Sequence, residues 1–315
     1  MAYTKFEKII IIGYGRVTAQ VLEHVCDRKS DYGYSVEYIE HEPHPFSTLK
    51  KTCQARGVPY FSIPEKWELG RRLEAVEEET LVLSASNNFL FPASVVEKPN
   101  VAIVNFHNAL LPRFPGRNAP SWAIYEGEGK TGITWHYVTE GVDEGGVILQ
   151  KSCGIGPDVK AYELTERLMA LAYEGFCECF PGILEESAEA RAQEALQGRR
   201  LYRSKEVPGG GHFDTRDNPE QIYRLLRALD YGKSAIFPRA TATHGGREIR
   251  ILRYRKLERE AAQEDGGGTG FLYLPLDEAY VLRLKYEEIG KGTEDEYGRK
   301  DTGAVGGDRR GNPLL

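Results

Sequence analysis

The stretch KIIIIGYGRVTAQVLEHV, residues 8–25, starts with an apolar run, turns at Gly13-Tyr14-Gly15 and continues with apolar residues at helical spacing. An apolar run that ends in glycine predicts a buried strand and a tight turn, and the spacing over residues 17–25 predicts a helix. The strand pattern returns at residues 36–39, 80–84 and 101–106, and a helix is expected over residues 46–56. Strands that alternate with helices predict an α/β fold, a Rossmann-like parallel sheet with crossover helices.

The pattern changes in the second half of the chain. Apolar residues at helical spacing over residues 161–180 predict a helix packed on the sheet, and a charged stretch follows at 185–200. A helix is then expected over 219–228. Alternating runs at 235–243, 248–257, 271–274 and 280–284 predict a small antiparallel barrel or sheet, similar to an OB fold. We therefore expect a larger domain over residues 1–198, a smaller β-rich domain over 199–291 and a loose tail over 292–315.

Composition narrows the class of protein. The 315 residues are 41% hydrophobic and 28% charged, which excludes a fibrous or wholly disordered chain. The apolar run at residues 9–12 is too short to span a bilayer, and the N-terminus lacks the pattern of a secretory signal. The five cysteines are scattered and form no C-x-x-C. We therefore expect a cytoplasmic protein with reduced thiols, no bound metal and no membrane partner.

The charge is unevenly distributed along the chain. The formal net charge is −6, which argues against wholesale binding to nucleic acid. Residues 199–259, however, carry a net charge of +8. Such a block can receive an anion, such as a diphosphate or an RNA backbone, or it can be the solvated face of a small β-rich domain. The sequence leaves both interpretations open.

The first glycine motif is half of a dinucleotide-binding fingerprint. Gly13 and Gly15 have the right spacing, but Thr18 occupies the position of the third glycine. We favour a turn that brings a strand and a helix close together over a nicotinamide site. Gly13, Tyr14 and Gly15 remain candidate substrate-binding residues.

Residues 104–146 contain the strongest chemical signal. Asn105 and His107 point to the same face of a strand because side chains alternate along it, and they lie at its carboxyl end, where open α/β sheets bind ligands. Asp143 lies in a glycine-flanked loop that can bring a carboxylate to the same place. The amide and an imidazolium can hydrogen-bond a developing oxyanion, and the carboxylate can raise the imidazole pKa and help to remove a proton from an amine. No G-x-S-x-G is present to supply a serine nucleophile.

These residues resemble the formyltransferase family that uses 10-formyltetrahydrofolate. The resemblance rests on Asn105, His107, the run Ala109-Leu-Leu-Pro112 and Asp143, and it covers residues 8–180. Ala109 departs from the family, which usually has serine there. The resemblance implies that Asn105 and His107 polarise the formyl carbonyl and that Asp143 tunes His107 and relays protons. It also implies that residues 1–198 form the catalytic domain.

The resemblance further implies where the two substrates bind. The pteridine ring of the folate would lie between the loops at residues 86–92 and 138–143. The implied donor-binding residues are Asn88, Phe89 and Leu90 in the first loop and Val138, Thr139, Glu140 and Val142 in the second. Ordinary core packing is the alternative for the apolar residues of the first loop. Arg113, Trp135 and His136 are candidate acceptor-binding residues, and Trp135 is as well explained as a core residue.

The family formylates several kinds of amine. The chain length and the appended domain favour a small-molecule acceptor, and the basic block favours a nucleotide-linked amino sugar. Residues 40–46 lead directly to the next expected helix, without the Arg/Lys-rich insertion of the tRNA enzymes, which makes a nucleic-acid partner a weaker expectation. Amino acids on peptide-synthetase carriers and methionyl-tRNA stay open as acceptors, whereas the enzymes that formylate glycinamide ribonucleotide are single domains with a different first glycine loop. A formyltetrahydrofolate hydrolase, a nicotinamide oxidoreductase and a non-catalytic binding module are the rival functions, and a homodimer is left open.

Overall fold

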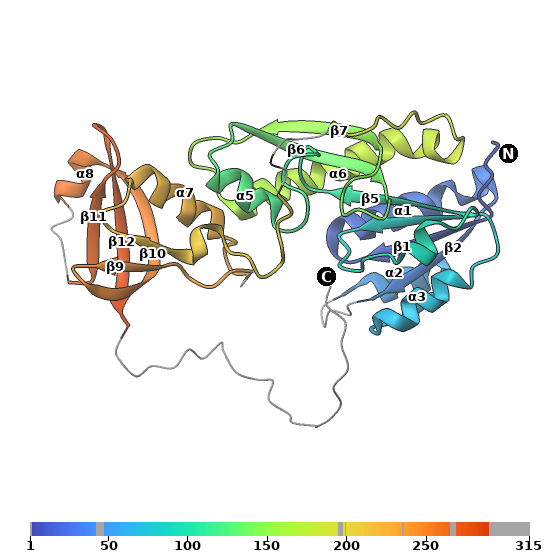
Figure 1. The fold of residues 1–315 in the computed structure, drawn as a ribbon, viewed down its shortest axis with the longest axis horizontal. Coiled ribbons are helices and arrows are strands. Elements are labelled where there is room, and N and C mark those ends of the chain that lie inside the picture. The colour runs from blue at the N-terminus through green and yellow to red at the C-terminus, as the bar shows by residue number, and fades with distance from the viewer. Residues whose placement is uncertain are drawn as a thin grey trace, which may run out of the picture.

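The computed structural model describes residues 2–41, 47–194, 198, 200–234, 236–264 and 269–289. Within these ranges the chain forms two sheets that lie at opposite ends of the molecule, with the contacting helices α5 (Ala119–Tyr125) and α7 (Pro219–Leu229) between them (Figure 1). The expected tail at 292–315 lies outside the described residues, as does the start of the helix expected over 46–56.

The first sheet has seven strands in the order β3-β2-β1-β4-β5-β6-β7. Its strands are β1 (Lys8–Gly13), β2 (Ser35–Glu40), β3 (Tyr60–Ser62), β4 (Thr80–Ala85), β5 (Val101–His107), β6 (Lys130–Tyr137) and β7 (Val147–Gly154). Strands β1 to β5 are parallel, which confirms the Rossmann-like fold. The sheet is not parallel throughout, because β6 and β7 pair antiparallel and form a hairpin on the edge of β5.

Helices cover both faces of this sheet because successive residues of each central strand are apolar. In β1, Ile9 and Ile11 pack with α1 (Gly15–Tyr32) and α6 (Ala161–Leu184) on one face. The alternate residues Ile10 and Ile12 pack against α3 (Lys66–Glu74) and α4 (Ala93–Val96) on the other. The short helix α2 (Leu49–Arg56) contacts α1. This two-sided burial is typical of parallel sheets.

The second sheet has five strands in the order β11-β12-β10-β9-β8. Its elements are β8 (His212–Asp214), α7, β9 (Thr241–His244), β10 (Arg247–Glu258), α8 (Arg259–Glu264), β11 (Phe271–Pro275) and β12 (Tyr280–Glu288). These strands are antiparallel except for the β8–β9 pair, so the β-rich second region is confirmed. The start of the strand expected over 235–243 is wrong, because β9 begins only at Thr241. Pro238 has no backbone N–H to donate to a neighbouring strand.

The two regions are joined by specific polar contacts. Lys160 at the start of α6 forms an ion pair of 2.9 Å with Asp230, just after α7. Asp158 lies 3.0 Å from Lys256 of β10 and accepts a hydrogen bond of 3.0 Å from the Tyr223 hydroxyl of α7. We propose the boundary between the catalytic and the β-rich domain near residue 198, in the segment that connects α6 to the second sheet.

The turn at Gly13 is explained by close backbone packing. A Cβ atom at Gly13 would overlap the carbonyl oxygen of Ala85 at the end of β4. The side chain of Thr18, at the third position of the motif, donates a hydrogen bond of 2.6 Å to the same carbonyl. The glycine is therefore required where β1, β4 and α1 meet, as expected for a strand–helix approach.

Candidate active site

The candidate site lies at the carboxyl end of β5, where the sheet changes from parallel to antiparallel. The strand register aligns Asn105 of β5 with Ser84 of β4 on one side and with His136 of β6 on the other. The Ser84 hydroxyl donates a hydrogen bond of 2.7 Å to Oδ1 of Asn105. This bond fixes the amide so that its nitrogen points toward the hairpin.

Asp143 reaches this place from the loop between β6 and β7. Its Oδ2 atom lies 3.4 Å from Nδ1 of His107 and accepts a hydrogen bond of 2.7 Å from the backbone nitrogen of Gly116. Nε2 of His107 donates to the carbonyl oxygen of Phe114 at 2.8 Å, since a carbonyl can only accept. The side chains of His107 and Asp143 are 5% and 10% exposed, so the carboxylate and the ring meet in a nearly dry environment.

His136 belongs to the same cluster. Its Nδ1 atom lies 2.8 Å from the carbonyl oxygen of Tyr137 and therefore carries a hydrogen, which leaves Nε2 of the neutral ring as an acceptor. Nδ2 of Asn105 donates to this Nε2 atom at 3.2 Å. The other oxygen of Asp143, Oδ1, lies 3.5 Å from the same nitrogen. The carboxylate of Asp143 thus lies between two imidazoles.

The buried environment sets the charges of this cluster. Burial lowers the pKa of His107, and the charge of Asp143, which acts to raise this pKa, offsets only part of the effect. Burial acts to raise the pKa of Asp143, but the positive charge that His107 and His136 carry when they are protonated in acid, together with the Gly116 N–H, holds it well below its usual range. The carboxylate therefore acts to raise the pKa of His107, as the sequence suggests, but burial of the ring outweighs it. The cluster holds an ionised carboxylate beside a ring that is ready to accept a proton.

The two loops of the implied donor site lie next to one another. Phe89 is buried and packs in the same apolar cluster as Phe91 and the half-buried Val138. Nη1 of Arg117 donates to the carbonyl oxygen of Asn87 at 3.4 Å and links the first loop to the segment beside the cluster. Phe89 is thus a core residue at the base of this region, whereas Leu90 is 72% exposed.

The other donor-site candidates lie around this apolar base. Asn88 is in the β4–α4 loop, and the residues from Thr139 to Val142 follow β6 in the hairpin loop that carries Asp143. Glu140 and Glu97 share a hydrogen bond between their carboxyl groups, which raises the pKa of Glu97. The structure brings the two loops together, and donor binding by these residues remains a proposal.

The acceptor candidates have different positions. The structure corrects the placement of Trp135 among the acceptor-binding candidates. Its side chain is fully buried, its indole nitrogen donates to the Ala172 carbonyl oxygen of α6 at 2.9 Å, and it packs on Phe176. Successive side chains of a strand point to opposite faces of the sheet, so Trp135 faces α6 while the next residue, His136, faces the cluster. Gly13, Tyr14 and Gly15 lie at the same edge of the sheet as the cluster, across β4 from β5.

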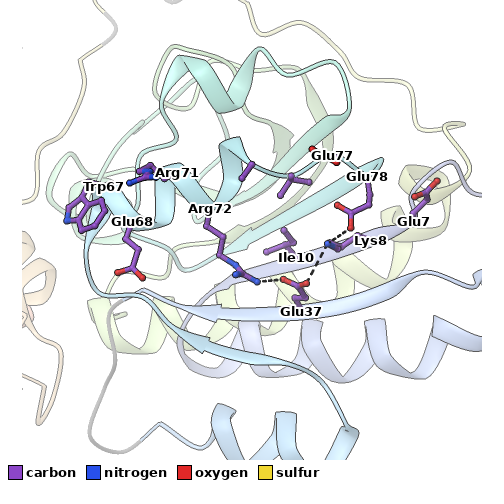
Figure 2. A pocket seen from close by; sticks show the side chains of 12 residues that line it. Glu7, Lys8, Ile10, Glu37, Trp67, Glu68, Arg71, Arg72, Glu77 and Glu78 are labelled. Carbon is purple, nitrogen blue, oxygen red and sulfur yellow. Dashed lines mark hydrogen bonds and ion pairs between the residues drawn. The ribbon is translucent and has the colours of Figure 1, made fainter.

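Arg113 lies on the surface, where it forms an ion pair with Glu128. Both residues line a hollow of about 360 Å³. Phe114, whose carbonyl oxygen accepts the hydrogen bond from His107, forms another part of its wall. Figure 2 shows a different groove, of about 830 Å³, lined by residues of β1, β2 and α3. There Lys8 pairs with Glu37 and Glu78, and Arg72 pairs with Glu37. Because Lys8 begins β1, this groove lies at the opposite edge of the sheet from the cluster.

The basic block of residues 199–259 is in good part neutralised within the molecule. Arg216, Arg224, Arg247, Arg250 and Lys256 each form an ion pair with an acidic side chain. These pairs support the interpretation of the block as a charged face of the β-rich region rather than as a receiver of a diphosphate.

Several contributors to the cluster have no signal in the sequence. The Gly116 N–H and the Phe114 carbonyl are backbone groups, and the pattern of residue types does not show them. His136 was expected in an acceptor pocket, although its position on β6 directly opposite Asn105 would have placed it here if the hairpin had been recognised. In the described ranges, no helix has the length and apolarity needed to cross a membrane, and no three acidic, histidine or cysteine side chains are grouped as metal ligands would be.

The chain is similar to known proteins over most of its length. The family model described as formyl transferase matches residues 8–180. A methionyl-tRNA formyltransferase from Anaeromyxobacter dehalogenans is 33% identical over 209 residues, which cover 65% of this chain and 64% of that enzyme, just under two thirds of its length. A GDP-perosamine N-formyltransferase from Brucella melitensis is 29% identical over 229 residues, 73% of this chain and 87% of that enzyme.

A solved structure shows the same fold. The N-formyltransferase from Helicobacter canadensis, determined in complex with folinic acid and dTDP-3-aminofucose, superposes with a TM-score of 0.66 at 14% identity. The match covers 90% of this chain and all of that one. Because the match extends over both sheets, the arrangement of a Rossmann-like sheet with an appended β-rich region is shared by the two proteins.

Proposed function

The chain belongs to the formyl transferase family, and we propose that it transfers a formyl group from 10-formyltetrahydrofolate to the primary amine of a nucleotide-linked amino sugar. The observation that carries the proposal is the position of the Asp143 carboxylate between His107 and His136, with the Asn105 amide beside them. This arrangement can donate a hydrogen bond to an oxygen and accept a proton within one site.

The reaction must form one bond and break another at the formyl carbon. The amine nitrogen bonds to this carbon, the bond from the carbon to N10 of the folate breaks, and the proton that leaves the amine ends on N10. Asn105 has one Nδ2 hydrogen beyond the one that it gives to His136, and it donates this hydrogen to the formyl oxygen as negative charge develops there. His107 accepts the amine proton at Nδ1, and the adjacent Asp143 carboxylate stabilises the resulting imidazolium.

The loops at 86–92 and 138–143 supply the features that a flat heteroaromatic donor needs. Apolar side chains such as Phe89 and Val138 form a wall, and the backbone groups of the same loops can hydrogen-bond the edge of a ring. Both loops border the carboxyl edge at which Asn105 lies. We therefore assign this region to the pteridine of the donor.

The choice of acceptor rests on how far the relatives match. The alignment with the GDP-perosamine enzyme covers 87% of that enzyme, whereas the alignment with the methionyl-tRNA enzyme covers 64% of it. The sugar enzyme is therefore matched over more of its own length than the tRNA enzyme, which favours a nucleotide-linked amino sugar as the acceptor. The 33% identity of the tRNA enzyme keeps methionyl-tRNA as the second candidate.

An acceptor panel tests this proposal directly. The protein is incubated with 10-formyltetrahydrofolate and, separately, with nucleotide-linked amino sugars, carrier-bound amino acids, methionyl-tRNA or no acceptor, and the release of tetrahydrofolate is followed. We expect release with an amino sugar and appearance of the formamide by mass spectrometry. Release only with tRNA would overturn the acceptor, and equal release with formate production in the absence of any acceptor would identify a hydrolase.

A further inference from the structure

The loop that carries Asp143 is held from outside the hairpin by a side chain of the segment that connects the two sheets. Nε2 of Gln193 donates to the carbonyl oxygen of Asp143 at 2.9 Å and to the carbonyl oxygen of Gly145 at 2.8 Å. Both hydrogens of this amide are therefore used, and the orientation of the amide is fixed because only its nitrogen can donate.

This loop needs an external restraint because its backbone is strained. Asp143 has a φ of 55°, in the left-handed region that a residue with a Cβ atom rarely adopts. A non-glycine residue keeps such a conformation only where its surroundings hold it. The neighbouring Gly145 adds a second constraint, since a Cβ atom there would overlap the carbonyl oxygen of Tyr137.

The connecting segment is itself anchored to the sheet. Arg191 and Val147 exchange two backbone hydrogen bonds of 2.7 and 2.8 Å, which add a short antiparallel bridge at the start of β7. The Arg191 guanidinium also donates to Oε1 of Gln150 at 3.1 Å. Gln193 follows this anchor by two residues, so its amide is held at a fixed distance from the loop.

The same segment restrains the carboxylate from its other side. Tyr202 exchanges backbone hydrogen bonds with Pro115 and Arg117, of 3.0 and 2.8 Å, and its ring packs on Trp122. These bonds fix the turn that contains Gly116, whose N–H binds Oδ2 of Asp143. The backbone of Asp143 and the donor to its side chain are thus both held by residues that follow α6.

From these contacts we propose that Gln193 is a positioning residue of the active site, which keeps Asp143 within reach of His107 and His136. This inference rests on the proposed formyl transfer for its kinetic consequences. Gln193 bonds the loop at the backbone of Asp143 and Gly145, so it acts on the reaction through the aspartate. In this chain the connection between the two domains therefore completes the catalytic geometry.

Gln193→Met tests the proposal because methionine has a similar length and no hydrogen to donate. Gln193→Glu is the second variant, since it keeps the shape but places an oxygen against two carbonyl oxygens. We expect kcat to fall by about 10- to 100-fold in both, with the acceptor KM changed by less than about threefold, because a misplaced catalytic group slows the reaction more than it weakens binding. Glu194→Gln, at an exposed neighbouring position, is the control and should keep the kcat of the original protein.

A second readout does not depend on activity. The charged and titratable groups that act on His107 are Asp143, His136 and Arg117. Asp143 is the group that raises its pKa, so loosening the loop should move the NMR titration of the His107 ring to lower pH in Gln193→Met but not in Glu194→Gln. The signal is assigned by its absence in His107→Gln.

The two readouts separate the two proposals. If the unaltered protein releases no tetrahydrofolate with any acceptor, the proposed function fails, and the titration still decides the role of Gln193. An unchanged His107 titration in a folded Gln193→Met protein would overturn the positioning role. So would a kcat equal to that of the unaltered enzyme.

Discussion

Oδ2 of Asp143 lies 3.4 Å from Nδ1 of His107, although the two residues belong to different elements, a hairpin loop and the end of a strand. The Nε2–H of His107 donates a hydrogen bond to the Phe114 carbonyl oxygen, so a proton accepted during the proposed reaction must enter at Nδ1, beside the carboxylate. An imidazolium formed there is stabilised at once by an ionised partner in a nearly dry site. In the proposed reaction, this contact makes Asp143 the charge that supports proton removal.

Asp143→Asn removes that charge and keeps the shape of the side chain. We expect kcat to fall by about 10²- to 10⁴-fold, the range that general acid–base groups contribute, while the protein stays folded. Tetrahydrofolate release under saturating substrates measures the effect, and Asp31→Asn, at an exposed position on α1, is the matched control. A loss of less than about threefold in a folded Asp143→Asn protein would remove the aspartate from the catalytic set.

The sequence predicted the elements whose periodicity is strong and local. The run at Ile9–Ile12 in β1 indicates a strand because it is short, continuously apolar and followed by a glycine turn, and the apolar stripe of α6 indicates a helix because its burial repeats every third to fourth residue. It did not predict the β6–β7 hairpin, because the glycine-rich loop obscured the two strands beside it. That hairpin sets His136 opposite Asn105, a position that the sequence analysis did not assign to it.

The candidate site was predictable only for side chains with distinctive chemistry. Asn105, His107 and Asp143 are recognisable because an amide, an imidazole and a carboxylate, at the end of a strand and in a loop, are groups that can together stabilise an oxyanion and remove a proton. Gln193 lies in a charged stretch without periodicity, and its role depends on a bridge between Arg191 and Val147 that only the folded chain forms. Long-range backbone contacts of this kind leave no local pattern.

Trp135→Phe tests the assignment of Trp135 to the core. The substitution removes the hydrogen bond to the Ala172 carbonyl and leaves a smaller ring among Phe106 and Phe176. We expect the free energy of unfolding to fall by about 1–3 kcal/mol, measured by urea denaturation. Acceptor KM should change by less than about twofold. An unchanged unfolding free energy together with a large rise in acceptor KM would return Trp135 to the acceptor pocket.

His136→Asn distinguishes a role in the cluster from a role in acceptor binding. Asparagine can still donate to the Tyr137 carbonyl oxygen, but it lacks the Nε2 acceptor to which the Asn105 amide donates. The amide then keeps only the hydrogen bond from Ser84, so the loss should appear in kcat, by on the order of tenfold, more than in acceptor KM. A pure rise in KM for the acceptor would instead support the pocket that the sequence suggested.

The buried ring of His107 makes the stability of the protein sensitive to mild acid. Its pKa in the folded protein lies below the ordinary value of 6.5, so between these two values the unfolded chain binds a proton that the folded chain does not. Stability therefore falls as the pH drops below about 6.5 and levels off at the lowered pKa. Asp143 acts over a different pH range. Its lowered pKa stabilises the fold in full above pH 3.8, and this stabilisation is lost only as the pH falls below that value. His107→Gln should reduce the slope of the unfolding free energy against pH just below pH 6.5, measured by urea denaturation, and the half-buried His24, whose pKa is also lowered, accounts for slope that remains. A slope in His107→Gln equal to that of the unaltered protein would show that His107 is not the group that titrates.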